Sequence, residues 1–182
     1  ERHEQMNLIP ISPYALSKKC NEDFAAIWCK PINLQYIGLR FFNVYGEGQL
    51  PNSPYSAVIP KFINAPSIKI YGDGETERDF TYVQDVCEAI QKAMESKYYN
   101  FCFNVGTGNR TSLNHLAQII NKLMGGKKKI EHLAERPNDT RCSIASTKLA
   151  EDVLKFKASY SLDEGLERTI KYYESLKNIH SI

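Results

Sequence analysis

Hydrophobic and polar residues follow one another along the chain with the spacings of helices and of strands in turn. Apolar positions three or four residues apart predict helices over four segments: 12–30, 83–94, 113–123 and 161–176. Short apolar runs predict extended segments at four places: 32–46, 68–75, 79–83 and 101–108. A shorter helix is predicted over 58–63. This alternation is typical of an α/β fold with parallel strands.

Local signals fix the ends of the first two elements. Ser12 and Pro13 are typical of the cap and the first position of a helix, which is expected to end near Pro31. The run 32–46 is almost continuously apolar. It therefore predicts one buried parallel strand that ends in a turn at Gly46.

The composition narrows the class of protein without indicating a reaction. Of 182 residues, 42% are hydrophobic and 24% are charged, which is ordinary for a globular domain with a sizeable core. The net charge of +2 gives no reason to expect nucleic acid or a membrane surface as a partner, and no apolar run is long enough to span a bilayer. Five cysteines without a C-x-x-C pair predict reduced thiols in a cytoplasmic protein. The four scattered histidines suggest no metal site.

Candidate chemistry begins with Tyr14 and Lys18 in SPYALSKK. Residues four apart lie on one face of a helix, so the two side chains are expected to be neighbours. An ammonium group beside a phenol stabilises the phenolate, which makes a tyrosine usable for proton transfer near neutral pH. The alternative is an exposed tyrosine and lysine on an ordinary helix, since this spacing is common by chance.

A glycine turn follows the predicted strand 101–108, but it lacks the features of a dinucleotide site. Such a site needs a third glycine three residues after the second, and position 111 is a threonine. We therefore interpret 106–108 as a strand-to-helix turn. The lysine run 127–129 is interpreted as a solvated loop.

Five stretches resemble, in order and in spacing, the extended short-chain dehydrogenase/reductases that act on nucleotide sugars. They are SPYALSK (12–18), LRFFNVYG (39–46), VIPKF (58–62), IYGDGETERDFTYVQDV (70–86) and RPNDTR (136–141). Within that family, LRFFNVYG and RPND are most similar to the UDP-sugar 4-epimerases. The alternative within the family is a dehydratase or decarboxylase acting on a similar substrate, and these usually differ around Phe42 and Asn43.

The resemblance also implies that part of the family's fold lies outside this sequence. In the family the tyrosine lies near the middle of the chain, after a glycine-rich NAD site, whereas 13 residues precede Tyr14 here. We therefore expect the C-terminal part of a Rossmann-like parallel sheet plus a small α/β substrate-binding domain. Residues 1–46 would be a remnant of the NAD-binding domain, and residues 47–182 mainly the nucleotide-sugar domain, with some segments returning to the Rossmann sheet.

The resemblance implies NAD as the cofactor. Because the main NAD site is missing from this sequence, we expect the fragment alone to be inactive. The other reading is a truncated, non-catalytic module that binds nucleotide sugars. In the family mechanism the tyrosine, here Tyr14, takes the proton from the sugar 4-hydroxyl. Lys18 stabilises the phenolate and holds the nicotinamide ribose, and Phe41 and Phe42 belong to the same cofactor site.

The resemblance assigns the remaining site residues to the UDP-sugar. Asn43 would donate to a phosphate or sugar oxygen, and the backbone of Val58 and Ile59 would contact the uracil. Arg78 and Arg136 would hold the diphosphate. Asp139 would accept from a ribose hydroxyl, and Ser143 would lie beside the hexose C2 substituent. The small Ser143 would admit N-acetyl sugars.

For each of these residues a structural role is the alternative: a turn asparagine, core packing, solvated charges, or a serine that starts an extended segment. The acidic neighbours of Arg78, namely Glu75, Glu77 and Asp79, are expected to face solvent or form turns. Family members often dimerise through the helix that bears the tyrosine. The apolar stripe of that helix, which includes Phe24 and Ile27, therefore predicts a homodimer.

Overall fold

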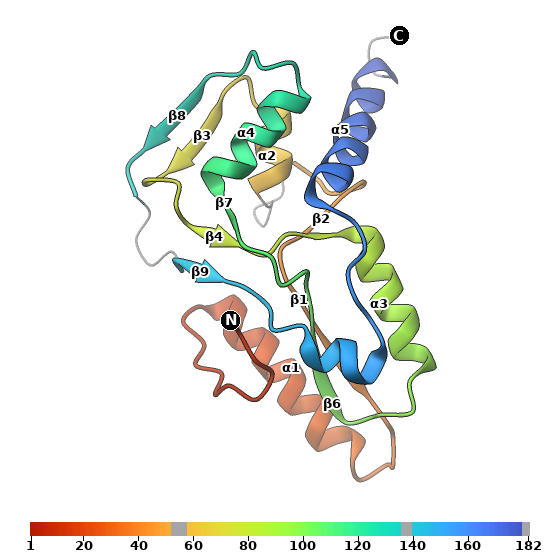
Figure 1. Cartoon of the computed structure of the whole chain (residues 1–182). Coiled ribbons are helices and arrows are strands. Elements are labelled where there is room, and N and C mark those ends of the chain that lie inside the picture. Colours follow the sequence, from red (N-terminus) through yellow and green to blue (C-terminus); the bar gives the residue numbers. More distant parts are fainter. Residues whose placement is uncertain (52–57, 136–139, 180–182) are drawn as a thin grey trace.

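The computed structural model describes residues 1–51, 58–135 and 140–179 (Figure 1). The helices are α1 (Pro13–Cys29), α2 (Val58–Asn64), α3 (Val83–Glu95), α4 (Leu113–Leu123) and α5 (Leu162–Ile179), with a π-helical turn η1 (Ala150–Leu154). The longer strands are β1 (Ile37–Phe41), β3 (Ile68–Tyr71), β6 (Phe101–Val105) and β8 (Ile130–Leu133). Two-residue strands complete the fold: β2 (Val44–Tyr45), β4 (Glu77–Arg78), β5 (Thr81–Tyr82), β7 (Thr111–Ser112) and β9 (Cys142–Ser143). All five predicted helices are confirmed.

Most of the strand pairing is parallel, as the alternation of elements predicts. β1 pairs with β6, β2 with β5 and β3 with β8, each in parallel. β4 lies between β9, which is parallel to it, and β7, which is antiparallel. No helix in the described ranges is both long and apolar enough to cross a membrane.

The prediction of one continuous buried strand over 32–46 is wrong. The strand is broken into β1 and β2 at Asn43, whose φ of +29° lies in the left-handed region that asparagine tolerates. Before the break, the Phe42 N–H still donates to the Val105 carbonyl at 3.0 Å, in line with β6. After it the chain pairs with β5 instead, and β1 itself is only half-buried. The break therefore moves the chain from one strand partner to another.

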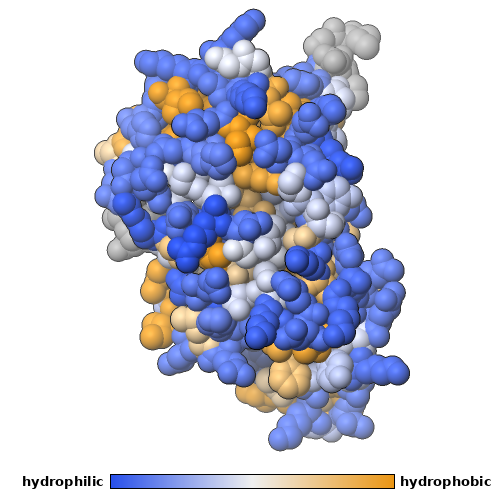
Figure 2. Space-filling view, viewed as in Figure 1, coloured by the Kyte–Doolittle hydropathy of each residue, from blue (hydrophilic) through white to orange (hydrophobic). Residues whose placement is uncertain are grey.

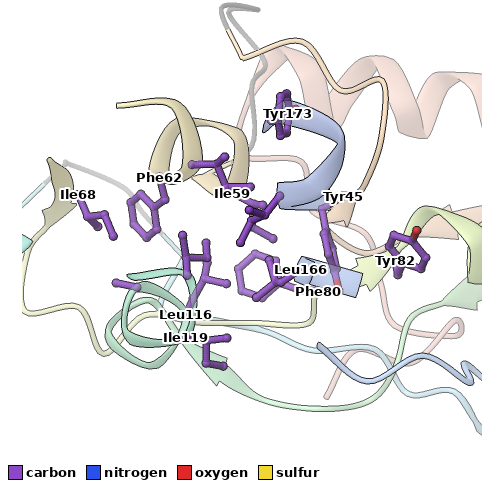
Figure 3. Packing of buried hydrophobic residues seen from close by; sticks show 14 of the residues in the cluster. Tyr45, Ile59, Phe62, Ile68, Phe80, Tyr82, Leu116, Ile119, Leu166 and Tyr173 are labelled. Carbon is purple, nitrogen blue, oxygen red and sulfur yellow. The ribbon is translucent and has the colours of Figure 1, made fainter. Parts of the chain in front are cut away.

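Two groups of buried side chains form the core. The larger group joins α2, α4 and α5 with β3 and β5, and Figure 3 shows its residues: Tyr45, Ile59, Phe62, Ile68, Phe80, Tyr82, Leu116, Ile119, Leu166 and Tyr173. The smaller group packs α3 and η1 onto the β1–β6 pair and includes Phe103, Val105 and Phe156. The apolar stripe expected on α3 is buried only in part, because Ile90 is 40% and Met94 is 82% exposed.

The lysine run 127–129 is not simply a solvated loop. Lys128 Nζ donates to the carbonyls of Phe62 and Ile63 at 2.6 Å each and to that of Ala65 at 2.7 Å. These carbonyls lie at the C-terminal end of α2, where backbone acceptors have no partner within the helix and a cation is stabilising. Burial lowers the pKa of Lys128. The side chain therefore ties α2 to the segment before β8.

α1 is attached to β1 by a half-buried ion pair. Arg40 donates from Nε and Nη2 to the two carboxylate oxygens of Glu22 at 2.8 and 2.7 Å. Successive strand residues point to opposite faces. Arg40 therefore faces α1, while its neighbours Ile37 and Leu39 pack with α3. A bidentate guanidinium–carboxylate pair fixes orientation as well as distance.

The opposite side of α1 leaves apolar side chains exposed. Phe24 is 65%, Ile27 74% and Trp28 60% exposed, and the rings of Phe24 and Trp28 stack with centroids 5.6 Å apart. Figure 2 shows hydrophobic side chains at the surface of the lower part of the molecule, where Figure 1 places α1 and the N-terminal segment. Only Cys29 of this helix is fully buried.

The Glu22–Arg40 pair should contribute to the free energy of unfolding by an amount that depends on pH. Hydrogen bonds from Arg40 lower the pKa of Glu22 from its ordinary value of 4.5. A carboxylate whose folded pKa is depressed contributes stability above its unfolded pKa, and that contribution is lost as the pH falls through the folded pKa. Glu22→Gln should therefore lower the free energy of unfolding at pH 7 by about 1–2 kcal/mol, and by progressively less below pH 4.5.

The measurement is denaturant unfolding of wild type and variant from pH 7 down to the acid limit of folding. Asp23→Asn is the matched control, because Asp23 follows Glu22 directly and pairs with Lys19, four residues earlier, on a more exposed part of the same helix. It should give a smaller change at neutral pH. A wild-type–variant difference that stays constant on acidification would contradict the assignment.

Candidate functional site

A pocket of about 830 Å³ opens between the N-terminal segment, α1 and β1. Six residues that the sequence singled out line it: Tyr14, Lys18, Phe41, Phe42, Asn43 and Ser143. They come from a helix, from the end of β1 and from β9, which are far apart in sequence. The fold thus brings the predicted catalytic pair, the predicted cofactor residues and part of the predicted substrate site to one cavity.

Tyr14 and Lys18 lie together in the first turns of α1. Ser12 caps the helix by accepting from the Ala15 N–H at 3.1 Å, and Pro13 takes the first position, as predicted. Lys18 Nζ lies 5.4 Å from the centroid of the Tyr14 ring. Tyr14 is 61% exposed and lines the pocket, so a ligand can reach its hydroxyl.

Asn43 is both a turn residue and a pocket residue. Its Nδ2 donates to the Asp79 carbonyl at 2.9 Å, and its own carbonyl accepts from the Thr81 N–H at 3.4 Å. The side-chain amide is therefore held in one orientation where β1 gives way to β2. The turn-forming alternative describes its backbone, and the residue also lines the pocket.

Arg78 lies beside the pocket rather than on its lining. It occupies β4, where it is the register partner of Ser143 on the parallel strand β9. Its Nη1 donates to the carbonyls of Glu77 at 2.9 Å and of Thr140 at 2.6 Å. One terminal nitrogen of the guanidinium is thus anchored to the backbone, next to a strand that does reach the cavity.

Val58 and Ile59 lie at the start of α2, apart from the pocket lining. Ile59 is fully buried, and Val58 packs against the same core group, so the core-packing interpretation describes their side chains. Arg136 and Asp139 lie outside the described residues.

The expectation that Asp79 faces solvent is wrong, because Asp79 is fully buried. Its carboxylate accepts from Thr107 N and Oγ1 at 2.9 and 2.7 Å, from Gly108 N at 2.9 Å and from Ala145 N at 3.2 Å. The glycine turn 106–108 is therefore an anion-binding turn whose anion is a side chain of the same protein. The expectation holds for Glu75, which is exposed. The one sequence signal for Asp79 was the glycine turn itself, whose converging N–H groups need an acceptor.

Charged groups that sequence reasoning did not select form another wall of the pocket. Arg40 and Glu22 both line it, and Arg40 Nη1 also donates to the Glu4 carbonyl at 3.0 Å. The Glu4 carboxylate accepts from the Asn104 N–H at 3.0 Å, which fixes the N-terminal segment over β6. In the sequence, the charged Arg40 inside the otherwise apolar run 37–42 was the signal that could have indicated this pair.

The arrangement offers a reachable phenol, an ammonium group over its ring and fixed amide and hydroxyl groups around one cavity. Such a set can accept a proton and bind a polar organic ligand. The described residues contain no cluster of three or more His, Cys, Asp or Glu side chains that could hold a metal ion.

The known proteins that this chain resembles include nucleotide-sugar epimerases, dehydratases and a decarboxylase. A UDP-glucuronate 4-epimerase from Thermodesulfobacterium geofontis is 32% identical over 99% of this chain and 56% of its own length. The structure of a UDP-N-acetylglucosamine 4-epimerase from Methanobrevibacter ruminantium M1, in complex with UDP-N-acetylmuramic acid, superposes with a TM-score of 0.91 at 38% identity. It is matched over 96% of this chain and 57% of that one.

A second structure carries a cofactor. The UDP-glucuronic acid 4-epimerase from Bacillus cereus, in complex with UDP-glucuronic acid and NAD, superposes with a TM-score of 0.85 at 27% identity, over 96% of this chain and 56% of that one. The chain thus spans about half the length of the curated relatives that it matches. The profile of the NAD dependent epimerase/dehydratase family matches residues 1–106, more than half of the chain. On this evidence the chain belongs to the NAD dependent epimerase/dehydratase family.

Proposed function

We propose that the full-length protein containing this chain is an NAD-dependent 4-epimerase of UDP-hexoses or UDP-N-acetylhexosamines. The observation that carries the proposal is the placement of Tyr14 and Lys18 on one helix turn, facing a pocket that Asn43 and Ser143 also line. The 4-epimerases among its relatives support the reaction class. The family also includes dehydratases, so a dehydratase or decarboxylase is the alternative that the assays below would reveal.

The residues of the pocket fit one end of NAD. Tyr14, Lys18, Phe41 and Phe42 present a phenol, an ammonium group and two aromatic rings to the same cavity, which suits a ribose and a nicotinamide ring. The turn 106–108 does not fit the pyrophosphate, because its N–H groups already bind Asp79. When bound, NAD would accept hydride from sugar C4 and return it to the opposite face. Residues outside this chain would hold the rest of the cofactor.

The protein's own groups carry the proton and position the sugar. Tyr14 Oη takes the proton from the sugar 4-hydroxyl during oxidation and returns it during reduction. Lys18, whose Nζ lies 5.4 Å from the centroid of the Tyr14 ring, is assigned to the nicotinamide ribose. Asn43, held by Asp79, donates to a sugar or phosphate oxygen.

The nucleotide is assigned to Arg78 on β4, to Val58 and Ile59 at the larger core group, and to Arg136 and Asp139. Arg78 and Arg136 hold the diphosphate, for which the planar guanidinium fork is suited. Asp139 accepts from a ribose hydroxyl, and the backbone of Val58 and Ile59 meets the uracil. Residues 1–46 belong to the NAD-binding domain and residues 47–182 mainly to the nucleotide-sugar domain; the packing of α3 and β6 onto β1 supports a partial return of the later segments.

The five cysteines are all free thiols, which supports a reducing, cytoplasmic location.

The first prediction from the proposed function removes the proton acceptor. In the full-length protein, Tyr14→Phe should lower kcat for UDP-sugar epimerisation by about 10²–10⁴-fold while KM changes little, because the other substrate contacts remain. Steady-state assays with UDP-glucose and UDP-N-acetylglucosamine measure both constants. Tyr98→Phe is the matched control, since Tyr98 is similarly exposed, at 59%, and lies outside the pocket. Near-normal turnover by Tyr14→Phe would show that another group is the base.

The second prediction concerns which sugar fits. Ser143 lines the pocket, and a phenol ring at this position would fill the space assigned to an N-acetyl group. Wild type should therefore turn over UDP-N-acetylglucosamine or its galacto epimer, and Ser143→Tyr should lose this activity while keeping that toward UDP-glucose. Ser143→Ala, which keeps the space, should retain both activities. N-acetyl turnover unaffected by the tyrosine would refute the role of Ser143.

The third prediction concerns assembly. The exposed apolar face of α1, with Phe24, Ile27 and Trp28, is assigned to a homodimer of the full-length protein. Ile27→Glu should convert the dimer to a monomer in sedimentation velocity at micromolar concentration. Met94→Glu, on the exposed side of α3, should leave the dimer intact. A wild-type monomer, or an Ile27→Glu dimer, would contradict this assignment.

A further inference from the structure

We propose that Asp79 is a positioning residue for nucleotide-sugar binding, which holds Asn43, Arg78 and Ser143 in the arrangement that the ligand needs. This inference rests on the proposed function and adds to it a residue outside the pocket lining. It follows from the two different sets of hydrogen bonds that Asp79 makes, one through its carboxylate and one through its backbone.

The carboxylate fixes Asp79 to two distant loops. It is fully buried, and its four hydrogen bonds come from Thr107, Gly108 and Ala145. The turn closes tightly around it: a Cβ at Gly106 would lie 2.6 Å from both Asp79 Oδ2 and Ala145 Cβ. A side chain at position 106 and the carboxylate could not both occupy this space.

The backbone of Asp79 transmits this anchoring to the site. Its carbonyl accepts from Asn43 Nδ2 at 2.9 Å, and its N–H donates to the Ser143 carbonyl at 3.1 Å. Arg78 precedes it directly and pairs in register with Ser143. The positions of Asn43, Arg78 and Ser143 therefore all depend on where the buried Asp79 is held.

The catalytic pair is held by a different anchor. Tyr14 and Lys18 lie on α1, which Glu22 and Arg40 attach to β1. Loss of the Asp79 anchor should therefore disturb the binding of the nucleotide sugar more than proton transfer. This predicts a rise in KM with kcat nearly conserved, whereas a merely structural defect would reduce the fraction of folded enzyme and leave KM unchanged.

The test is Asp79→Asn in the full-length protein. Its carboxamide keeps the size but turns two N–H groups toward backbone N–H groups that need an acceptor. KM for the UDP-sugar and the Kd for UDP, measured by calorimetry, should each rise at least tenfold, while kcat falls less than threefold. Asp85→Asn is the matched control: Asp85 is equally buried and accepts from Ser159 N and Oγ, away from the pocket. It should lower stability without changing KM or the UDP Kd.

A milder pair of variants covers the case in which Asp79→Asn does not fold. Thr107→Val removes the hydroxyl that donates to Asp79 at 2.7 Å and leaves the Thr107 N–H in place. KM and the UDP Kd should rise two- to fivefold in this variant. Thr107→Ser restores the hydroxyl and should restore both constants to the wild-type values.

The outcomes separate this inference from the function on which it rests. Unchanged KM and UDP Kd in the folded Asp79 or Thr107→Val variants, or the same behaviour as Asp85→Asn, would overturn the positioning role alone. A wild type that binds UDP but does not epimerise would overturn the epimerase proposal, and the UDP Kd values would still decide the role of Asp79. A wild type that does not bind UDP would overturn both.

Discussion

A carboxylate removed completely from water determines how the middle of this protein is put together. A buried ionised group is costly unless hydrogen bonds replace its hydration. Asp79 receives four, and none comes from a residue nearer than 28 positions along the chain. The end of β6 and the segment after β9 must therefore both reach the same point. Because Ala145 lies close to β9 and Asp79 to β4, the same contact also brings those two strands into register.

The second anchor of the structure is the ion pair between Glu22 and Arg40. It differs from Asp79 in that it is only half-buried and joins a helix to a strand. The two anchors act on different elements that contribute residues to the pocket. One orients α1, which carries Tyr14 and Lys18, and the other orients β4 and β9. Asn43 connects the two, because it follows β1, which carries Arg40, and its side chain donates to the Asp79 carbonyl. The positions of Tyr14, Asn43 and Ser143 around the pocket therefore depend on both.

The sequence was a good guide to features that local rules decide. Helix periodicity and the Ser12–Pro13 cap gave the helices, and four-residue spacing put Tyr14 and Lys18 side by side. It was a poor guide where a distant partner decides the outcome. Lys128 looked solvated because its acceptors lie more than 60 residues away in the chain, and Asp79 looked exposed for the same kind of reason. The break at Asn43 was also missed, since the apolar run does not reveal that β2 changes partner.

The turn at 106–108 matches a dinucleotide-binding motif only in part, and it binds a different partner. The missing third glycine argued against a dinucleotide site, but it did not say what the turn does. The structure supplies the reason: the N–H groups of Thr107 and Gly108, which could bind a phosphate, bind an internal carboxylate. A pyrophosphate placed there would have to displace Asp79 and leave a buried charge without partners. The turn therefore serves to join β4 to the end of β6 and to the segment after β9, and it has no free N–H groups at Thr107 and Gly108 to offer a pyrophosphate.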